Sequence, residues 1–454
     1  MATLAVWMNG ERVGDWITGR TGTPVFRYAR DWTESPNARA ISLSLPITAD
    51  REIRGPIVDH YFDNLLPDNA DIRRRIRDRF QLRSQDTFDL LEAVGRDCIG
   101  AVQLLPPDEP PIGWDRIDAK PLSTAEVARI LSNVTAPASM GGLDGANEDF
   151  RISIAGAQEK TALLKMGHTW YRPHGATPTT HILKLPLGII GNFRGDFSSS
   201  VENEWLCSRL LKLWGLPVAL TEIGTFDEQR ALVVERFDRQ WVGVDAKRAS
   251  ARGFKPPDGA WIARLPQEDF CQATGRPPAQ RYESDGGASM SEILQLLRAS
   301  ARAEADSAHF LLAQLSFWLL AATDGHSKNF SIHLEAGGAF TMTPLYDVLS
   351  AWPIIERGAR QLQYQDAKLA MAVVGHNRHY RLQEIQPRHW HTLALNAVGA
   401  PLWHRMQQLV ETAPEALDAI GAELPEGFPE SVLTRIRDGV AVQRTRFAAG
   451  AATL

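Results

Sequence analysis

The chain has 454 residues, of which 44% are hydrophobic and 23% are charged, and its formal net charge is −5 at pH 7. This length exceeds a single hydrophobic core and predicts two or three domains with the composition of a globular protein. The negative charge balance excludes a wholly basic nucleic-acid binder, although a local basic patch stays open.

Cysteine usage and the N-terminus indicate the compartment. Cys98, Cys207 and Cys271 lie far apart and form no metal-ligand spacing, which favours free thiols in a reducing cytoplasm. The N-terminal segment lacks the pattern of a signal peptide, and the most apolar predicted helix, 310–322, is too short to cross a bilayer. We therefore expect a cytoplasmic protein with no membrane association.

Residues 1–110 are expected to form an N-terminal subdomain of strands and helices. Asn9-Gly10 is a strong signal for a β-hairpin, and the segment 41–46 ("ISLSLP") is typical of another strand. Helical patterns follow within 57–80 and 87–95. Four prolines between 105 and 120 then indicate a linker, so we assign 111–149 to a linker with one helix, over 123–134.

The rest of the chain changes from β-rich to α-rich. Residues 150–245 are expected to hold strands and one helix, over about 200–214, with a capping-box pattern at 199–202 and Gly215 after its end. Residues 246–454 are expected to be mostly helical, apart from a basic loop at 246–260 and a strand pair within 329–347. This order predicts an α+β chain with two lobes.

The stretch "ATDGHSKNF" (321–329) carries more chemistry than a turn needs. An apolar helix leads into Asp324 and Asn329, and a predicted hairpin turning at Gly337-Gly338 then leads to Asp347. Helix, Asp-x-x-x-x-Asn loop, hairpin and Asp is the order of parts in protein-kinase-like enzymes. There the first Asp accepts the proton of the acceptor hydroxyl, and the other two residues bind metal. The alternative is that each of the three caps a helix or a turn.

A kinase also needs a strand lysine that holds the ATP phosphates. Lys184 stands between Leu183 and Leu185 in a short strand, so its side chain points away from the face that they share. A solvent-facing lysine on an edge strand is the alternative. Glu204, on the following helix, is the expected carboxylate partner, and "VVERF" (233–237) is the expected hinge strand.

A phosphate-covering turn is expected at "SIAGAQEKT" (153–161), where the sequence departs from common motifs. Gly156 lies between Ala155 and Ala157, where protein kinases carry a G-x-G-x-x-G sequence. Glu159 stands where a Walker A loop needs glycine. Small residues would still let backbone N–H groups approach a phosphate.

Several long motifs together resemble those of the HipA family, bacterial toxin kinases of toxin–antitoxin modules. They are "RISIAGAQEKTALL", "THILKLP", "VENEW", "ERFDR", "LPQEDFCQ", "YESDGG", "ATDGHSKNFS" and "LYDVLSAWP". The likeness extends into "YFDNLLPDN" near the N-terminus and covers nearly the whole chain. It implies a two-lobed protein-kinase-like fold, with 1–110 as the N-terminal subdomain, 150–245 as the ATP-binding part and 246–454 as the helical lobe. The basic loop 246–260 is longer than this resemblance leads us to expect.

The resemblance also implies roles for single residues. Asp324 is the expected catalytic base, Asn329 and Asp347 are the expected Mg²⁺ ligands, and Lys184 is the expected phosphate-binding lysine. Ser153 matches the serine that the family autophosphorylates. The full expected set of ATP-binding residues is Ala155, Gly156, Ala157, Gln158, Glu159, Lys160, Lys184, Glu235, Arg236, Phe237, His326, Lys328, Asn329, Tyr346 and Asp347.

Substrate and partners follow from the resemblance as expectations. The chain would be a serine/threonine kinase that uses ATP and Mg²⁺ to phosphorylate an aminoacyl-tRNA synthetase, with the glutamyl enzyme favoured, and so arrest growth. Its partner would be a HipB-like helix-turn-helix antitoxin, which would account for most contact with operator DNA.

Two alternatives stay open. One is a kinase of the same fold that acts on a small molecule or a lipid headgroup. The other is a DNA-binding co-repressor with a vestigial kinase site, for which the basic segment "GHNRHYR" (375–381) could contact phosphates. The intact set of Lys184, Asp324, Asn329 and Asp347 argues against a vestigial site.

Overall fold

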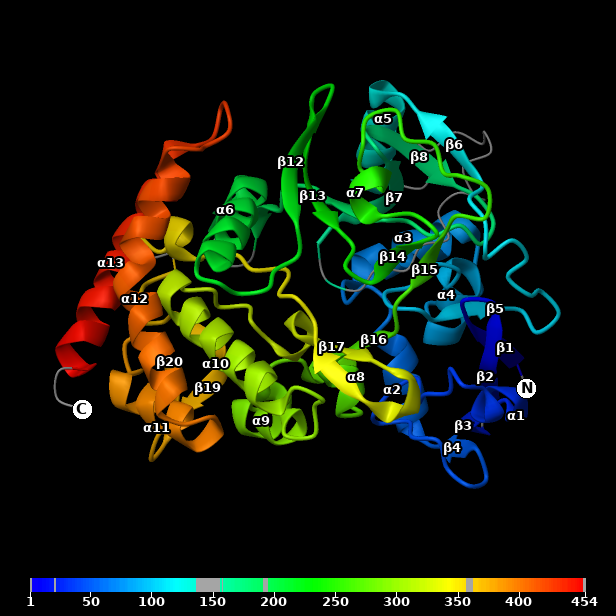
Figure 1. Ribbon diagram of the computed structural model, residues 1–454, viewed down its shortest axis with the longest axis horizontal. Coiled ribbons are helices and arrows are strands. Elements are labelled where there is room, and N and C mark those ends of the chain that lie inside the picture. Colours follow the sequence, from blue (N-terminus) through cyan, green and yellow to red (C-terminus); the bar gives the residue numbers. More distant parts are fainter. Residues whose placement is uncertain are drawn as a thin grey trace. The chain divides into compact units, whose positions relative to one another are not determined.

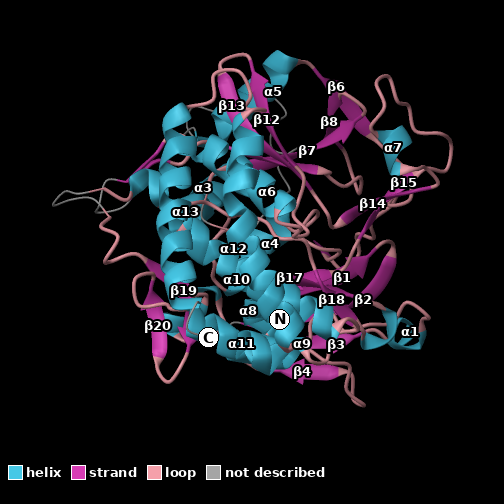
Figure 2. Ribbon diagram, turned by 60° about the vertical axis from the view of Figure 1, so that its left-hand side comes forward, coloured by secondary structure: helices cyan, strands magenta, loops and turns pink. Residues whose placement is uncertain are grey.

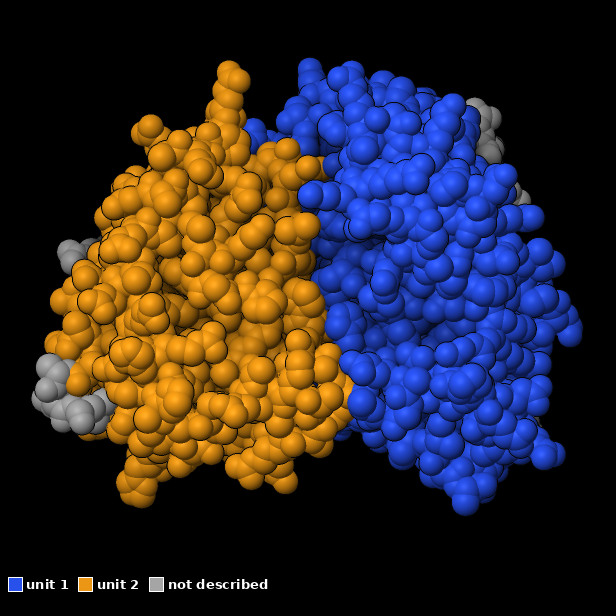
Figure 3. All heavy atoms as spheres, in the orientation of Figure 1, with its two compact units in different colours: residues 1–185, 224–279, 332–339 blue, residues 186–223, 280–331, 340–454 orange. Residues whose placement is uncertain are grey.

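The structure is a computed structural model and describes residues 2–19, 22–135, 156, 158–190, 195–356 and 362–451. The chain forms two compact units, which Figure 3 shows in different colours. Unit 1 consists of residues 1–185, 224–279 and 332–339, and unit 2 consists of residues 186–223, 280–331 and 340–454. Each unit is therefore assembled from segments that lie far apart in the sequence.

The N-terminal part of unit 1 is an antiparallel sheet in the strand order β4-β3-β2-β1-β5, accompanied by four helices (Figure 1). The strands are β1 (Ala2–Met8), β2 (Glu11–Gly19), β3 (Gly22–Tyr28), β4 (Glu52–Arg54) and β5 (Gln103–Leu105). The helices are α1 (Arg30–Glu34), α2 (Pro56–Asp63), α3 (Ala70–Phe80) and α4 (Thr87–Val94).

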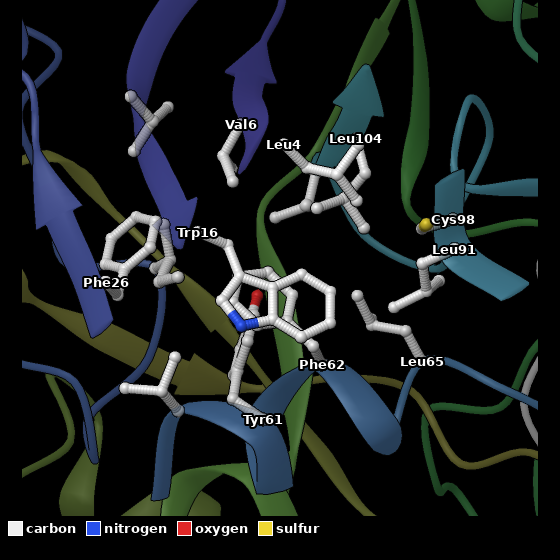
Figure 4. Close-up of a cluster of buried hydrophobic side chains, with 14 of the residues drawn as sticks. Leu4, Val6, Trp16, Phe26, Tyr61, Phe62, Leu65, Leu91, Cys98 and Leu104 are labelled. Carbon is white, nitrogen blue, oxygen red and sulfur yellow. The ribbon is translucent and has the colours of Figure 1, made fainter. Parts of the chain in front are cut away.

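An aromatic core holds this sheet and its helices together. Trp16 of β2 stacks on Phe62 of α2, with ring centroids 4.2 Å apart. Phe26 of β3 joins them, and Leu4 and Leu104 close the cluster from β1 and β5 (Figure 4). Burial of this apolar surface is the main force that stabilises the N-terminal part of the chain.

The predicted hairpin at Asn9-Gly10 is confirmed. Both residues have positive φ angles, 45° and 85°, as a two-residue hairpin turn requires. A side chain at position 10 would collide with the ring of Trp114, so glycine is needed there for space as well as for φ.

The predicted strand at 41–46 is wrong. This segment forms one isolated bridge, between Ser42 and Leu45, instead of pairing with a neighbouring strand. The Tyr28 hydroxyl satisfies the local backbone, because it accepts from the Ile41 N–H at 2.9 Å and donates to the Leu45 carbonyl at 2.5 Å. A buried side chain therefore replaces the strand partner that the alternating pattern predicted.

The second part of unit 1 is a sheet in the order β12-β13-β9-β7-β8-β6. Its strands are β6 (Ala119–Leu122), β7 (Lys160–Met166), β8 (Thr169–Pro173), β9 (His181–Lys184), β12 (Thr221–Phe226) and β13 (Gln229–Glu235). The predicted helix after the linker is confirmed as α5 (Thr124–Thr135), which packs on β7 and β13.

Short elements complete unit 1. They are β14 (Arg239–Val242), α7 (Ala246–Ala249), β15 (Trp261–Arg264), β16 (Gln267–Asp269) and α8 (Phe270–Ala273). The basic segment 246–260, predicted as a loop, begins with the single turn of α7, which Asp245 caps through its side chain.

Unit 2 is mainly helical and is built around α10 (Figures 1 and 2). Every residue of α10 from Asp306 to Leu320 is buried, as expected for a helix that other helices surround. The helices are α6 (Ser200–Leu213), α9 (Met290–Leu297), α10 (Ala303–Leu320), α11 (Pro387–Ala397), α12 (Ala400–Gly421) and α13 (Glu430–Ala451). Its strands include β10 (Gly188–Ile190), β11 (Gly195–Phe197), β18 (Phe340–Met342), β19 (Lys368–Val374) and β20 (Arg378–Arg381).

Two predictions for unit 2 need correction. Helix α6 forms where expected, but its capping box does not: the Ser199 side chain makes no cap hydrogen bond, and Glu202 is buried. The basic segment 375–381 belongs to the β19–β20 hairpin and is not a simple loop. Among the described residues, no helix is long and apolar enough to cross a membrane.

Candidate active site

The loop that carries Asp324 begins where the buried helix α10 ends. Ala321 adopts a left-handed conformation (φ 49°), and the Ala322 N–H returns to the Phe317 carbonyl at 2.8 Å, which stops the helix abruptly. Gly325 follows against the Phe317 ring, with no room for a side chain. The chain is thereby turned into a tight loop that lifts Asp324 away from the core.

Asp324 is exposed, whereas the residues that follow it are buried. Its side chain retains 67% of its accessible surface, and the Tyr282 hydroxyl donates a hydrogen bond to its Oδ1. His326 Nε2 lies 3.9 Å from the same oxygen, and the His326 N–H donates to the Asp324 carbonyl at 2.8 Å. The carboxylate is therefore held on one side and open to solvent on the other, as a base for an external acceptor must be.

Asn329 ends the loop, and Asp347 follows the hairpin that comes after it. Asn329 is only 3% exposed, and its Oδ1 has no hydrogen-bond partner among the described residues. Its Nδ2 is 3.5 Å from the Asp347 carbonyl. Asp347 itself has φ 61°, an uncommon conformation for a residue other than glycine. A strained backbone and a buried acceptor without a partner are both typical of a ligand site.

The donor set at these two residues fits Mg²⁺. An amide oxygen and a carboxylate are hard oxygen ligands, which this ion prefers. Among the described residues, no group of three or more His, Cys, Asp or Glu side chains is placed to hold a metal ion. Two protein ligands suit Mg²⁺ in a nucleotide site, where phosphate oxygens and water complete the coordination.

The predicted hairpin between Asn329 and Asp347 is confirmed. It contains β17 (Ser331–Leu334), the turn Ala336–Gly338 and β18. Within unit 2, the Thr343 N–H donates a hydrogen bond to the Ser331 carbonyl at 3.0 Å and so joins the two ends of the hairpin. Tyr346, at its end, donates to the Lys328 carbonyl at 2.8 Å and contacts the Ser331 hydroxyl at 2.5 Å. Tyr346 therefore joins the end of the hairpin to the loop.

Unit 1 carries the predicted phosphate-binding lysines. Lys184 of β9 lies directly opposite Lys160 of β7 in the antiparallel ladder, so both side chains leave the same face of the sheet. Lys184 is 6% exposed. The ladder therefore places two positive charges on one face of this sheet.

The segment before β7 is tied to the N-terminal part of unit 1. Gly156, with φ 110°, forms a bridge with Pro67, and the Asp68 N–H donates to its carbonyl at 3.1 Å. Glu159 forms an ion pair with Arg75 of α3. These contacts explain the glutamate that interrupts the Walker A pattern, because it serves to hold the segment.

Of the other predicted residues of this segment, the structure describes only Gln158. The Gln158 side chain donates to the Leu185 carbonyl at 2.6 Å, so it also supports the strand that bears Lys184. Ser153, Ala155 and Ala157 lie outside the described residues.

The predicted hinge at 235–237 has one exposed and one buried member. Glu235 is exposed at the end of β13, and Phe237 packs its ring edge-on against His333 with centroids 5.8 Å apart. The Arg236 guanidinium is buried and bonds twice to Asp238, at 2.7 and 2.9 Å, and to Thr179 at 2.9 Å. The Arg236 side chain is therefore occupied by buried contacts. Nucleotide contact at position 236 stays a prediction, and it concerns the main chain only.

A buried charge cluster around Arg236 was not predicted from the sequence. It joins Asp97, Asp238 and the guanidinium groups of Arg236, Arg239 and Arg264. The sequence does place charged residues within apolar segments, in "GRDCIG" and "ERFDR". Which charges pair with which depends on contacts between distant parts of the chain. Tyr282 was missed for the same reason.

The fold and this loop define a class of protein. An α+β chain with a β-rich and a helical part, in which a buried helix leads to an Asp–Asn loop and a hairpin ending in Asp, has a protein-kinase-like fold. A family model described as the HipA N-terminal domain matches residues 4–105, and one described as the HipA-like C-terminal domain matches residues 152–422. The chain belongs to the HipA family, which confirms the resemblance seen in the sequence.

Individual relatives support this assignment. The inferred kinase Y4mE of Sinorhizobium fredii is 32% identical over 451 residues, covering 96% of each chain. The serine/threonine-protein kinase toxin HipA of Shewanella oneidensis is 26% identical, covering 77% of this chain and 75% of the relative.

A solved structure confirms the predicted α+β kinase-like fold. It is a complex of Shewanella oneidensis HipA, HipB and operator DNA, and it matches with a TM-score of 0.77 at 21% identity. The match covers 99% of this chain and 98% of that chain.

Proposed function

We propose that this chain is an ATP-dependent serine/threonine protein kinase that acts as the toxin of a toxin–antitoxin module. The observation that carries the proposal is the 324–347 segment. It offers an exposed carboxylate at Asp324, a buried Asn329 Oδ1 without a hydrogen-bond partner in the described part of the chain, and Asp347 beside it. Membership of the HipA family, with a relative named as a serine/threonine kinase toxin, supports the same conclusion.

In this proposal Asp324 is the general base. It accepts the proton of the acceptor hydroxyl while the hydroxyl oxygen bonds to the γ-phosphorus of ATP. The bond from that phosphorus to the bridging oxygen breaks, and ADP leaves. Lys184 and Lys160, on one face of their sheet, contribute positive charge toward the phosphates.

Asn329 and Asp347 would hold Mg²⁺ through the Asn329 Oδ1 and the Asp347 carboxylate. The bound ion supplies positive charge that offsets the charge on the transferring phosphoryl group. Tyr346 contacts Lys328 and Ser331 and so keeps these ligands in place. We assign Lys328 and His326, both buried beside Asn329, to nucleotide contact from this loop.

Residues 155–160 would contact the phosphates, and Glu235 to Phe237 would contact the adenine. We further propose that Ser153 is autophosphorylated and that this inactivates the enzyme. A phosphate there adds about −1.5 to −2 charges close to the triphosphate, so the segment would leave the nucleotide. Equal ATP affinities of the phosphorylated and unphosphorylated proteins would exclude this switch.

The proposed acceptor is an aminoacyl-tRNA synthetase, with the glutamyl enzyme favoured on family grounds. The proposed partner is a HipB-like antitoxin that provides most of the contact with operator DNA. A HipA of the same fold has been solved with HipB and operator DNA, which supports the choice of partner.

Isosteric variants test the kinase assignment. Asp324→Asn should keep Mg-ATP binding but lower phosphoryl transfer by several orders of magnitude, whereas Asp347→Asn should weaken metal-dependent nucleotide binding as well. Asparagine tolerates the positive φ at position 347, so the fold is retained. Glu228→Gln, at an exposed position, is the control.

The assay is transfer from labelled ATP in a cell lysate, followed by identification of the labelled protein. Near-normal transfer by both Asp variants would show that the assignment is wrong. Labelling of a protein other than a synthetase, or of a small molecule, would redirect the acceptor.

A further inference from the structure

Tyr282 contacts Asp324 but has no place in the nucleotide or metal roles assigned so far. It belongs to the "YESDGG" segment, 42 residues before Asp324 in the chain, and both residues lie in unit 2. Its hydroxyl donates to Oδ1 of Asp324. This hydrogen bond therefore acts on the carboxylate that is proposed to be the base.

The backbone that carries Tyr282 is firmly held. Its carbonyl accepts from the N–H groups of Asp285 and Gly287, at 3.0 and 2.8 Å. A side chain at Gly287 would lie 2.6 Å from that carbonyl oxygen, so the turn has room only for glycine. The next residue, Glu283, accepts from the buried Ala372 N–H at 2.7 Å. Tyr282 thus projects from a rigid support.

The Tyr282 ring is held as well. It meets the His326 ring edge-on, with centroids 4.9 Å apart at 87°, and the Arg281 guanidinium lies 5.2 Å from its centroid. The Arg281 carbonyl accepts from the Ser327 N–H at 3.1 Å, which joins this segment to the loop. Tyr282 therefore has a fixed position relative to the loop that carries Asp324.

The hydroxyl remains a donor under physiological conditions. Burial, followed by the negative charge of Asp324, raises the pKa of the Tyr282 phenol above its ordinary value. A protonated phenol keeps its hydrogen bond to the carboxylate, and hydrogen bonds to a charged acceptor are stronger than neutral ones.

We propose that Tyr282 is a positioning residue for phosphoryl transfer: it fixes Oδ1 of Asp324 and thereby aims Oδ2 at the acceptor hydroxyl. The inference rests on the proposed function, in which Asp324 is the base. An exposed aspartate without this contact samples several rotamers, and a loss of alignment at the reacting atoms lowers the rate without changing how tightly the nucleotide binds.

Two substitutions separate the hydroxyl from the ring. Tyr282→Phe removes only the hydroxyl and keeps the contact with His326, so kcat should fall roughly 10- to 100-fold. The KM for ATP and the dissociation constant of Mg-ADP should stay within about twofold of wild type, because no group at the nucleotide changes. Tyr282→Ala also removes the support of His326, so it should weaken Mg-ADP binding as well.

Tyr364→Phe is the matched control. The Tyr364 hydroxyl donates to Gln443 at 2.8 Å, away from the loop, so its removal should leave kcat and Mg-ADP binding unchanged. Normal Mg-ADP binding by Tyr282→Phe, measured by calorimetry, also shows that this variant is folded.

A wild-type or raised kcat for Tyr282→Phe would overturn the proposal, as would a loss of Mg-ADP affinity equal to that of Tyr282→Ala. Asp324→Asn distinguishes a failure of the proposed function from a failure of the role of Tyr282. If it still transfers phosphate, the proposed function has failed. If it is inactive while Tyr282→Phe is normal, only the role of Tyr282 has failed.

Discussion

Replacement of Asp97 by asparagine should destabilise unit 1 strongly. Asp97 is 5% exposed and accepts from the Thr179 N–H and hydroxyl at 3.0 and 2.6 Å. It also accepts from Arg239 at 2.8 Å, while the guanidinium groups of Arg236 and Arg264 lie 3.4 and 3.3 Å away. Asparagine keeps the shape of this side chain but removes its charge.

The magnitude follows from the charges that remain. With Asp238, the cluster holds three guanidinium groups and two carboxylates, so the loss of one carboxylate raises its net charge from +1 to +2. Breaking a buried ion pair by removing one partner costs about 3–5 kcal/mol. Typical total stabilities are about 5–15 kcal/mol, so this loss is a large part of the whole.

Thermal unfolding at pH 7 is the measurement. For a unit of about 250 residues, each kcal/mol corresponds to about 2–4 °C, so the melting temperature should fall by roughly 6–20 °C. Glu34→Gln, which removes the exposed ion pair with Arg30, should leave it unchanged. A shift below about 2 °C for Asp97→Asn would refute the view that this carboxylate balances the buried guanidinium groups.

The same effect depends on pH in a defined direction. Burial raises the pKa of Asp97, but the guanidinium groups of Arg239, Arg236 and Arg264 outweigh it and hold that pKa well below its ordinary value. A depressed folded pKa gives stability that is present above the unfolded value of about 3.9 and lost as the pH falls below it. The difference between wild type and Asp97→Asn should therefore be constant from pH 6 to 8 and shrink below pH 4.

Two further predictions concern Glu268 and Gly156. Glu268 is 1% exposed and burial raises its pKa from 4.5 to about 8, so its stabilising contribution is full below pH 4.5 and is lost as the pH rises through 8. Melting temperatures between pH 5 and 9 should fall more for wild type than for Glu268→Gln, and parallel curves would contradict this. Gly156→Ala should weaken ATP binding about tenfold, because φ 110° strains alanine and its Cβ would lie 2.5 Å from Lys160 Nζ. Gly427→Ala, at φ 71° with nothing nearby, is the control, and equal ATP affinities for the two variants would contradict the prediction.

The parts of the site that could be predicted are those whose chemistry is local. The end of α10, the loop with Asp324 and Asn329, and the hairpin before Asp347 all follow one another within 30 residues of sequence. Turn glycines, strand alternation and helix stops act over that range, so the pattern predicts the order of elements correctly.

The parts that could not be predicted depend on contacts between distant segments. The capping box at 199–202 failed because Glu202 is buried in unit 2, and tertiary packing overrides a local cap. The strand at 41–46 failed because Tyr28 supplies the hydrogen bonds that a neighbouring strand would have made. The donor to Asp324, Tyr282, lies 42 residues earlier, where no short motif links the two.

Within unit 1, the charge cluster joins the two family domains through buried ion pairs. Asp97 comes from the segment matched by the N-terminal family model, whereas Arg236, Arg239 and Arg264 come from the C-terminal one. Neither segment alone could bury its share of these charges without a large desolvation cost.

A second link between the two family domains reaches the proposed phosphate-binding segment directly. Pro67 bridges Gly156, and Arg75 of α3 forms an ion pair with Glu159. Both links join the N-terminal part to segments assigned to the nucleotide, since Arg236 lies in the hinge and Lys160 follows Glu159. The N-terminal part of unit 1 therefore holds the segments proposed to bind ATP, and we expect a substitution there to alter the proposed catalysis although it touches neither ATP nor the acceptor.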